Sequence, residues 1–377
     1  MQISFAHRTF QWTNDAPGKA AVHCVIIGFG REALGQKHLF EYADIKGQLH
    51  EIAASNINPY LVDAPNVVLP ARSNPLCNVP PIVFGSMPND GGHLLLSDEE
   101  KIEFSKLEPM AKDWIKPFLG AEEFINKRKR WCLWLVDCPP NLLKAMPHVL
   151  KRIEAVKKVR AESTRKTTQE LAATPSLFGE IRQPKSNYLL IPRVSSERRL
   201  FVPIGFLSEE IVASDATLVI PNATLYHFGI LTSTMHNAWV RQVCGRLKSD
   251  FRYSNTIVYN NFPWPTVSVI AGSTRNLNAK ANTLNQVQGY NLENDKLVGT
   301  IEIAAQTVLD ARAQFPHESL ANLYGATMPP VLVNAHSALD KAVDASYVPD
   351  GGAKKYASDA ERVAFLFKRY QALTSLI

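Results

Sequence analysis

The sequence lacks the features of a membrane or secreted protein. No stretch of its 377 residues reaches the roughly 18 to 20 uninterrupted apolar residues of a membrane helix. The opening residues, MQISFAHRTFQW, do not follow the basic-then-apolar order of a signal peptide. The cysteines number five, an odd count, and none has the spacing of a metal site. We therefore expect a cytoplasmic protein with reduced thiols, no metal and no membrane partner.

Common catalytic motifs are also absent from the sequence. It contains no GxSxG, HExxH or Walker phosphate loop. His227 and His236 are nine residues apart, which does not suit a ligand pair on one helix face. The run GFGREALG follows an apolar stretch, but Gly35 comes too late for the pattern GxGxxG that begins at Gly28 and Gly30. We predict that this chain has no catalytic residues and is inactive alone as a methyltransferase or nuclease.

One short stretch comes close to a base-flipping loop. In SNINPYLVDAP, Asn58-Pro59-Tyr60 resembles the Asn-Pro-Pro-aromatic loop with which amino-methylating DNA enzymes hold a flipped-out base. The second proline is missing, because Ile57 and Asn58 precede a single proline. We interpret the stretch as a look-alike of that loop.

Local patterns predict a mixed α+β fold. The apolar run Gly18–Phe29 indicates a buried strand, and Ser97 followed by Glu100 indicates the capping box of a helix. A long basic helix is expected after Pro139, and strands are expected from Tyr188 onward with one helix among them. An Asn/Ser/Gln-rich loop over 270–296 precedes three expected helices, at 297–313, 329–345 and 358–375.

Positive charge is clustered more strongly than the formal net charge of +6 implies. Residues 151–200 hold twelve Lys or Arg against five Asp or Glu, and Lys127-Arg128-Lys129-Arg130 lies just upstream. Such clusters favour a polyanionic partner, although a solvated helix face is the alternative for each. The cations expected to hold DNA phosphates are Arg128, Lys129, Arg130, Lys185, Arg193, Arg198, Arg199 and Arg246.

The stretch RLKSDFRYS, residues 246–254, is the best candidate for reading bases. If it is one strand, alternate side chains share a face. One face would carry Arg246, Lys248, Asp250, Arg252 and Ser254, and the other would anchor through Leu247, Phe251 and Tyr253. Mixed charge suits base edges in a major groove, since Lys or Arg donates to guanine and Asp accepts from the cytosine amino group. The alternative is a solvated edge strand.

Several long stretches resemble one protein family. They include SFAHRTFQWTNDAPGKAAVHCVIIGF, LFGEIRQPKSNYLLIPRVSSERRLFVPIGF, GRLKSDFRYSNTIVYNNFPWP, the segment from NINPY to GGHLLL, and the segment from LANLYGATMPP to KRYQAL. In order, and across essentially the whole chain, they resemble the C-terminal part of MmeI-like enzymes. These are single-chain type II restriction–modification proteins that join an endonuclease, an adenine-specific DNA methyltransferase and a target-recognition domain.

The resemblance implies a domain organisation for the chain. It makes 1–48 the last strands of a methyltransferase domain, 49–266 a target-recognition domain, 267–296 a linker and 297–377 a helical C-terminal module. The nuclease, the S-adenosylmethionine site and the intact base-flipping loop would lie upstream, so no cofactor is expected in this chain. Its expected partners are double-stranded DNA and a catalytic methyltransferase/nuclease part, in the same parent chain or in a separate subunit.

The resemblance also bears on specificity. Alternating positions in 248–252 resemble specificity determinants that vary among family members, and Ala216 is expected to complete a pocket with Arg252. The chain would then choose where the enzyme acts. The alternative functions are a free-standing DNA methyltransferase subunit with a degenerate active site and a protein-interaction adaptor.

Overall fold

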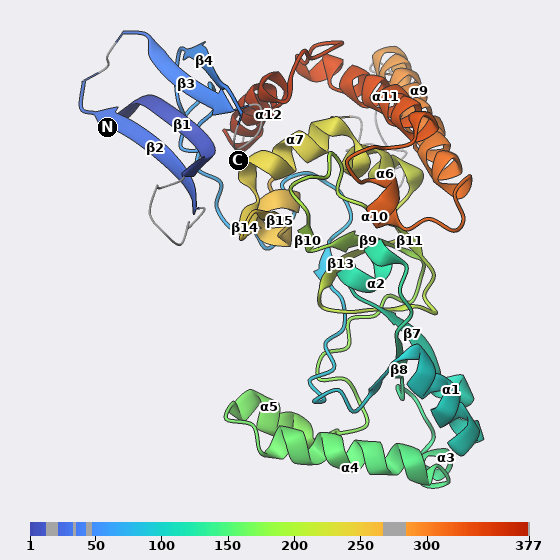
Figure 1. Cartoon of the computed structure of the whole chain (residues 1–377). Coiled ribbons are helices and arrows are strands. Elements are labelled where there is room, and N and C mark those ends of the chain that lie inside the picture. The colour runs from blue at the N-terminus through green and yellow to red at the C-terminus, as the bar shows by residue number, and fades with distance from the viewer. Residues whose placement is uncertain (13–21, 33–34, 43–46, 267–283, 376–377) are drawn as a thin grey trace. The chain divides into compact units, whose positions relative to one another are not determined.

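The computed structural model describes residues 1–12, 22–32, 35–42, 47–266 and 284–375. The fold is α+β, as the sequence predicts (Figure 1). Two compact units are present: the first comprises residues 1–79, 229–305 and 335–377, and the second comprises 80–228 and 306–334.

The first unit begins with a four-stranded sheet in the order β2-β1-β3-β4. β1 pairs antiparallel with β2 and parallel with β3, and β3 pairs antiparallel with β4. Ala6, Leu39, Ala54 and Ile57 pack together on one face of this sheet. The strands are β1 (Gln2–Trp12), β2 (Val22–Gly30), β3 (Lys37–Tyr42) and β4 (Leu49–Ala54). The strand expected over Gly18–Phe29 is confirmed from Val22 onward, but its predicted burial is wrong: Val25, Ile26, Ile27 and Phe29 are between 41% and 63% exposed.

Helices and a hairpin form the rest of this unit's core. Trp239 is buried, packs on Phe367 with ring centroids 5.2 Å apart, and donates to the carbonyl of Val258 at 3.0 Å. The elements are α7 (Thr234–Val243), β14 (Gly245–Leu247), β15 (Asp250–Arg252), a π-helix (Asn255–Tyr259), a 3-10 turn (Val348–Asp350) and α12 (Asp359–Thr374).

The C-terminal helices agree only in part with the sequence pattern. α11 (Pro330–Ser346) and α12 confirm the second and third expected helices. α9 (Leu284–Ala313) begins well before 297, so the loop predicted up to 296 is wrong for 284–296. Residues 267–283 lie outside the described part. None of the described helices combines the length and apolarity needed to cross a membrane.

A buried histidine makes the first unit sensitive to acid. The Nε2 of His236 lies 2.9 Å from the hydroxyl of Tyr253, and burial lowers the pKa of His236 to about 3. Its pKa in the unfolded chain is about 6.5. Because the folded pKa is the lower one, His236 stabilises the fold above pH 6.5, and this contribution is lost as the pH falls toward 3.

We expect His236→Gln to reduce this acid sensitivity. Between pH 6.5 and 4.5, the free energy of unfolding should fall less steeply in the variant, by up to about 1.4 kcal/mol per pH unit. Denaturant titrations at several pH values measure this slope. Exposed His317, replaced by glutamine, is the matched control. Equal slopes in His236→Gln and the wild type would contradict the assignment.

The second unit contains two small sheets. An antiparallel sheet has the order β11-β9-β13-β5, and a mixed sheet has the order β12-β7-β8-β6. Their strands are β5 (Val83–Phe84), β6 (Leu95–Leu96), β7 (Ile115–Leu119), β8 (Trp131–Leu133), β9 (Tyr188–Pro192), β11 (Gly205–Leu207), β12 (Val212–Ala213) and β13 (Thr217–Pro221). The short strand β10 (Val194–Ser195) belongs to neither sheet.

Helices cover parts of the second unit. The predicted capping box is confirmed, since Glu100 N donates to Ser97 Oγ at 3.1 Å and Ser97 N donates to the Glu100 carboxylate at 2.8 Å. The long basic helix expected after Pro139 is instead broken into α3, α4 and α5. The helices are α1 (Asp98–Leu107), α2 (Ala121–Asn126), α3 (Pro140–Lys144), α4 (Pro147–Ala161), α5 (Lys166–Glu170), α6 (Leu225–Thr232) and α10 (Leu320–Leu323), with 3-10 turns at Pro109–Trp114 and Leu171–Ala173.

A single buried arginine ties α4 to the segments beside it. The side chain of Arg160 is fully buried, and its guanidinium donates to five backbone carbonyls at 2.7 to 3.0 Å. Those carbonyls belong to Pro88, Asn89, Leu171, Thr174 and Leu177. An arginine has five N–H donors, so every one of them is used here.

Candidate DNA interface

The segment 246–254 forms a hairpin, and the single continuous strand expected from the sequence is wrong. Leu247 pairs with Asp250, which leaves Lys248 and Ser249 as a two-residue turn. Lys248 has φ of 57°, and a positive φ at the first loop position is typical of the type I′ and II′ turns of two-residue hairpins. The carbonyl of Ser249 accepts from Arg246 Nη1 at 2.8 Å, which holds the turn closed.

The turn changes which side chains share a face. Directly paired residues of an antiparallel hairpin point to the same side. Asp250 therefore shares its face with Leu247 and, two residues along, with Arg252. Arg246 pairs with Phe251 and stacks on its ring at 4.2 Å, on the opposite face. The prediction that Arg246 shares one strand face with Asp250 and Arg252 is therefore wrong. Lys248 lies at the tip of the hairpin.

The hairpin is anchored on one side and open on the other. Phe251 and Tyr253 are buried, which confirms two of the three expected anchors. Leu247, the third, is 53% exposed and is no anchor. Lys248 and Arg252 are exposed. A rigidly supported hairpin thus presents two cations, with the half-buried carboxylate of Asp250 between them in sequence.

Ala216 belongs to the second unit, whereas Arg252 belongs to the first. Ala216 is exposed in the turn that immediately precedes β13. Its backbone N donates to Ser214 Oγ at 3.2 Å, and its carbonyl accepts from Arg193 N at 3.3 Å. A shared pocket of Ala216 and Arg252 stays a prediction.

The four consecutive cations at 127–130 are engaged by neighbouring groups. Arg128 pairs with Glu122, Lys129 with Asp98 at 3.2 Å, and Arg130 with Glu123 at 3.3 Å, while Lys127 Nζ donates to the carbonyl of Pro316. Arg128 and Lys129 are largely exposed, so their pairs contribute little to stability and can be exchanged for phosphate contacts.

The other side chains expected to bind phosphates differ in solvent exposure and in their contacts within the protein. Lys185 and Arg198 are exposed, and Arg199 is half-buried. Arg193 donates to the carbonyl of Asp215 at 2.9 Å and lies 4.8 Å from the ring centre of Phe84. Of this group, Lys185 and Arg198 are therefore the best placed to reach a DNA backbone.

The Asn58-Pro59-Tyr60 stretch is used by the fold itself. Asn58 is fully buried, and its Oδ1 accepts from Tyr60 N at 3.0 Å and from Val62 N at 3.2 Å. The Tyr60 hydroxyl accepts from Leu69 N, and the Tyr60 ring packs against Phe367. Both side chains stabilise a turn, so their structural contacts explain these residues without a role in binding a flipped base.

The first two glycines of the run GFGREALG lie in a strand. Gly28 and Gly30 lie within β2, and neither has a positive φ. A methyltransferase's S-adenosylmethionine pocket needs a tight turn after a strand, and Gly28 and Gly30 do not form such a turn. Within the described ranges, no group of His, Cys, Asp and Glu side chains could hold a metal ion.

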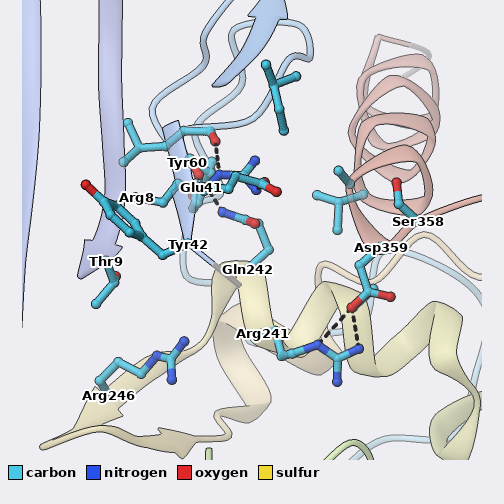
Figure 2. Close-up of a pocket in the computed structure, with 15 residues that line it drawn as sticks. Arg8, Thr9, Glu41, Tyr42, Tyr60, Arg241, Gln242, Arg246, Ser358 and Asp359 are labelled. Atoms are coloured by element: carbon cyan, nitrogen blue, oxygen red, sulfur yellow. Dashed lines mark hydrogen bonds and ion pairs between the residues drawn. The ribbon is translucent and has the colours of Figure 1, made fainter. Parts of the chain in front are cut away.

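A pocket of about 560 Å³ lies in the first unit near the hairpin (Figure 2). Arg241 on α7 binds Asp359 of α12 at 2.6 Å, and Arg8 on β1 pairs with Glu41. Burial lowers the pKa of Arg8 to about 10. Arg246 lines the same pocket. Sequence reasoning missed Arg8 and Arg241, because residues so far apart carry no local motif.

Comparison with family models identifies the family of this chain. Three family models match successive parts of the chain: "MmeI, DNA-methyltransferase domain" over 1–41, "MmeI, target recognition domain" over 63–266 and "MmeI, C-terminal domain" over 293–377. The chain belongs to the MmeI family. The resemblance found in the sequence is therefore confirmed, and the hairpin lies inside the matched target-recognition region.

Two relatives show how much of an MmeI-family protein is represented here. DNA methyltransferase A of Bacillus subtilis (strain 168) is 37% identical over 376 residues, which are 99% of this chain and 39% of that protein. The solved type IIL restriction–modification enzyme MmeI, in complex with DNA, is 44% identical with a TM-score of 0.83. That match covers 99% of this chain and 46% of MmeI. The chain thus spans less than half of each relative.

Proposed function

We propose that this chain is the sequence-reading part of an MmeI-type DNA methyltransferase or restriction enzyme. The match of the target-recognition model over 63–266 carries the proposal. The similar MmeI structure is a DNA complex, which supports double-stranded DNA as the partner. A catalytic part, in the same parent chain or a separate subunit, would bind S-adenosylmethionine and act where this chain directs it.

The hairpin is proposed to contact base edges. Its exposed tip carries Lys248, a donor suited to guanine, and next along the strand face comes Asp250, an acceptor suited to the cytosine amino group. Arg252, on the same face as Asp250, would read a neighbouring base pair. Arg246 is directed onto Phe251, so we assign it to supporting the hairpin and leave a phosphate contact as a secondary role.

Surface cations are proposed to hold the DNA backbone without reading sequence. We expect the pair of substitutions Lys185→Glu and Arg198→Glu to weaken binding to all duplexes about equally. For every phosphate that is no longer neutralised, the slope of log affinity against log salt should become shallower by about 0.9. Fluorescence anisotropy with several unrelated duplexes between 50 and 200 mM salt measures both effects.

Exposed Lys341 on α11, replaced by glutamate, is the matched control for charge alone. It should leave the salt slope near the wild-type value. An altered preference among the duplexes, with the slope unchanged, would contradict the assignment of Lys185 and Arg198 to phosphates. Absence of any salt-dependent DNA binding in the wild type would favour the adaptor alternative, and binding of S-adenosylmethionine by this chain would favour the methyltransferase alternative.

A further inference from the structure

The pocket of about 560 Å³ in the first unit carries more positive than negative charge on its walls. Three arginines line it, and so do two carboxylates, each of which is held by one arginine. Arg8 pairs with Glu41, whereas Arg241 binds Asp359 through Nε at 3.0 Å and through Nη2 at 2.6 Å. Among the described residues that line the pocket, the charge of Arg246 is therefore the one that no carboxylate balances.

The exposed guanidinium of Arg246 keeps donors that the fold does not use. Its Nη1 donates to the carbonyl of Ser249 at 2.8 Å, and its Cζ lies 4.2 Å from the centre of the Phe251 ring. These two contacts fix the plane of the group, while Nε and Nη2 make no hydrogen bond within the described part of the chain. Nε and Nη2 of an arginine form a two-pronged donor that matches two oxygens of a phosphate. Figure 2 shows Arg246 apart from the joined pair of Arg241 and Asp359.

Arg246 belongs to the hairpin that is proposed to contact bases. It precedes Lys248 by two positions and lies on the face opposite to Asp250 and Arg252. The major groove of DNA is about 12 Å wide, admits a two-stranded ribbon and is bordered by the two phosphate strands. A hairpin that enters the groove with Asp250 and Arg252 toward the bases keeps Arg246 near the phosphates at the border.

We propose that this pocket receives one phosphate of the DNA backbone and that Nε and Nη2 of Arg246 bind it. The inference rests on the proposed function, because it adds a phosphate anchor to the hairpin that is proposed to read bases. Such a contact fixes the register of the hairpin on the duplex and carries no sequence information itself. Arg246 then serves the hairpin twice, through Phe251 as a support and through its open donors as a phosphate ligand.

Arg246→Gln tests the charge, because glutamine keeps an amide that can still donate to the carbonyl of Ser249. Affinity for every duplex should fall by the same factor, roughly eightfold at about 0.1 M salt, and the slope of log affinity against log salt should become shallower by about 0.9. Fluorescence anisotropy measures both. Lys341→Gln, at an exposed cation of the same unit, is the matched control and should change neither. A slope equal to that of the wild type would overturn the inference, because a role in supporting the hairpin alone does not alter it.

Duplexes with one uncharged methylphosphonate linkage at a time locate the phosphate. The wild type should lose affinity at one linkage whose neutralisation leaves Arg246→Gln unaffected, because the two changes remove the same contact. Additive losses at every linkage would refute the contact. Inorganic phosphate, titrated at constant ionic strength, covers the other source of this group. Saturable binding that Arg246→Gln abolishes, together with additive losses on all duplexes, would assign the pocket to free phosphate and overturn the DNA contact.

Asp359→Asn provides a change in the opposite direction, which damage to the fold would not imitate. It removes a carboxylate from the pocket wall, so DNA binding should tighten by up to about fivefold at low salt, as for one charge about 4 Å away in water. Equal or weaker binding would contradict the inference. A shallower slope in Arg246→Gln without any preferred sequence in the wild type would refute the proposed function and leave the phosphate contact standing. A preferred sequence bound with equal slopes by both chains would do the reverse.

Discussion

Replacing Asp250 by alanine is expected to cost about 1–3 kcal/mol of binding to the preferred duplex, roughly a 5- to 150-fold loss in affinity. The loss should be confined to one base pair, because the carboxylate accepts from a single cytosine amino group. Competition titrations with duplexes changed at one position at a time measure it. Ser249→Ala, in the same turn, is the matched control.

A charge exchange tests the same readout more sharply. Lys248 lies in the hairpin turn and Asp250 begins β15, so the two groups remain close although they are not on one strand. The pair Lys248→Glu and Asp250→Arg should prefer C·G where the wild type prefers G·C. An unchanged preference in this double variant would rule out base reading and make the hairpin a solvated edge.

The second large effect concerns stability. Arg160→Met should destabilise the second unit by about 3–5 kcal/mol, since five carbonyls within the fold would lose their common donor. The stability of Arg160→Lys should lie between those of the wild type and Arg160→Met, because an ammonium group has only three donors. Denaturant unfolding measures the loss, and hydrogen exchange at the backbone amide of Asn89 and at the non-proline amides of 171–177 should locate it.

Exposed Lys158 on the same helix provides the control for Arg160. Lys158→Met removes a positive charge and a long side chain without breaking hydrogen bonds to those carbonyls. It should unfold within about 0.5 kcal/mol of the wild type, as surface substitutions usually do. Equal midpoints for Arg160→Met and Lys158→Met would show that the carbonyls find other partners.

Local signals in the sequence were the reliable ones. Ser97 and Glu100 predicted a capping box from two residues three positions apart, and alternation near Phe251 and Tyr253 predicted a buried side. The hairpin turn was missed because its first position, Lys248, takes a positive φ that favours glycine. One two-residue turn was enough to move Arg246 to the opposite face from Asp250.

Long-range pairing lay beyond the sequence. From the sequence, the cations at 128–130 were interpreted as unpaired positive charge. In the structure they have carboxylate partners, which include Asp98, some thirty residues upstream. Arg160 read as one more member of a basic helix, yet it is fully buried against carbonyls that include those of Pro88 and Asn89. Charge counts report composition, whereas availability for DNA depends on which partners the fold supplies.

Selection from a randomised duplex library tests the central claim most directly. The wild-type chain, immobilised at moderate salt, is presented with the library, and the retained duplexes are sequenced over several rounds. Sequence-specific recognition predicts enrichment of one motif, bound at least about 1,000-fold more tightly than unrelated DNA. Retention without an enriched motif, at an affinity that depends on salt alone, would contradict the claim that this chain reads DNA sequence.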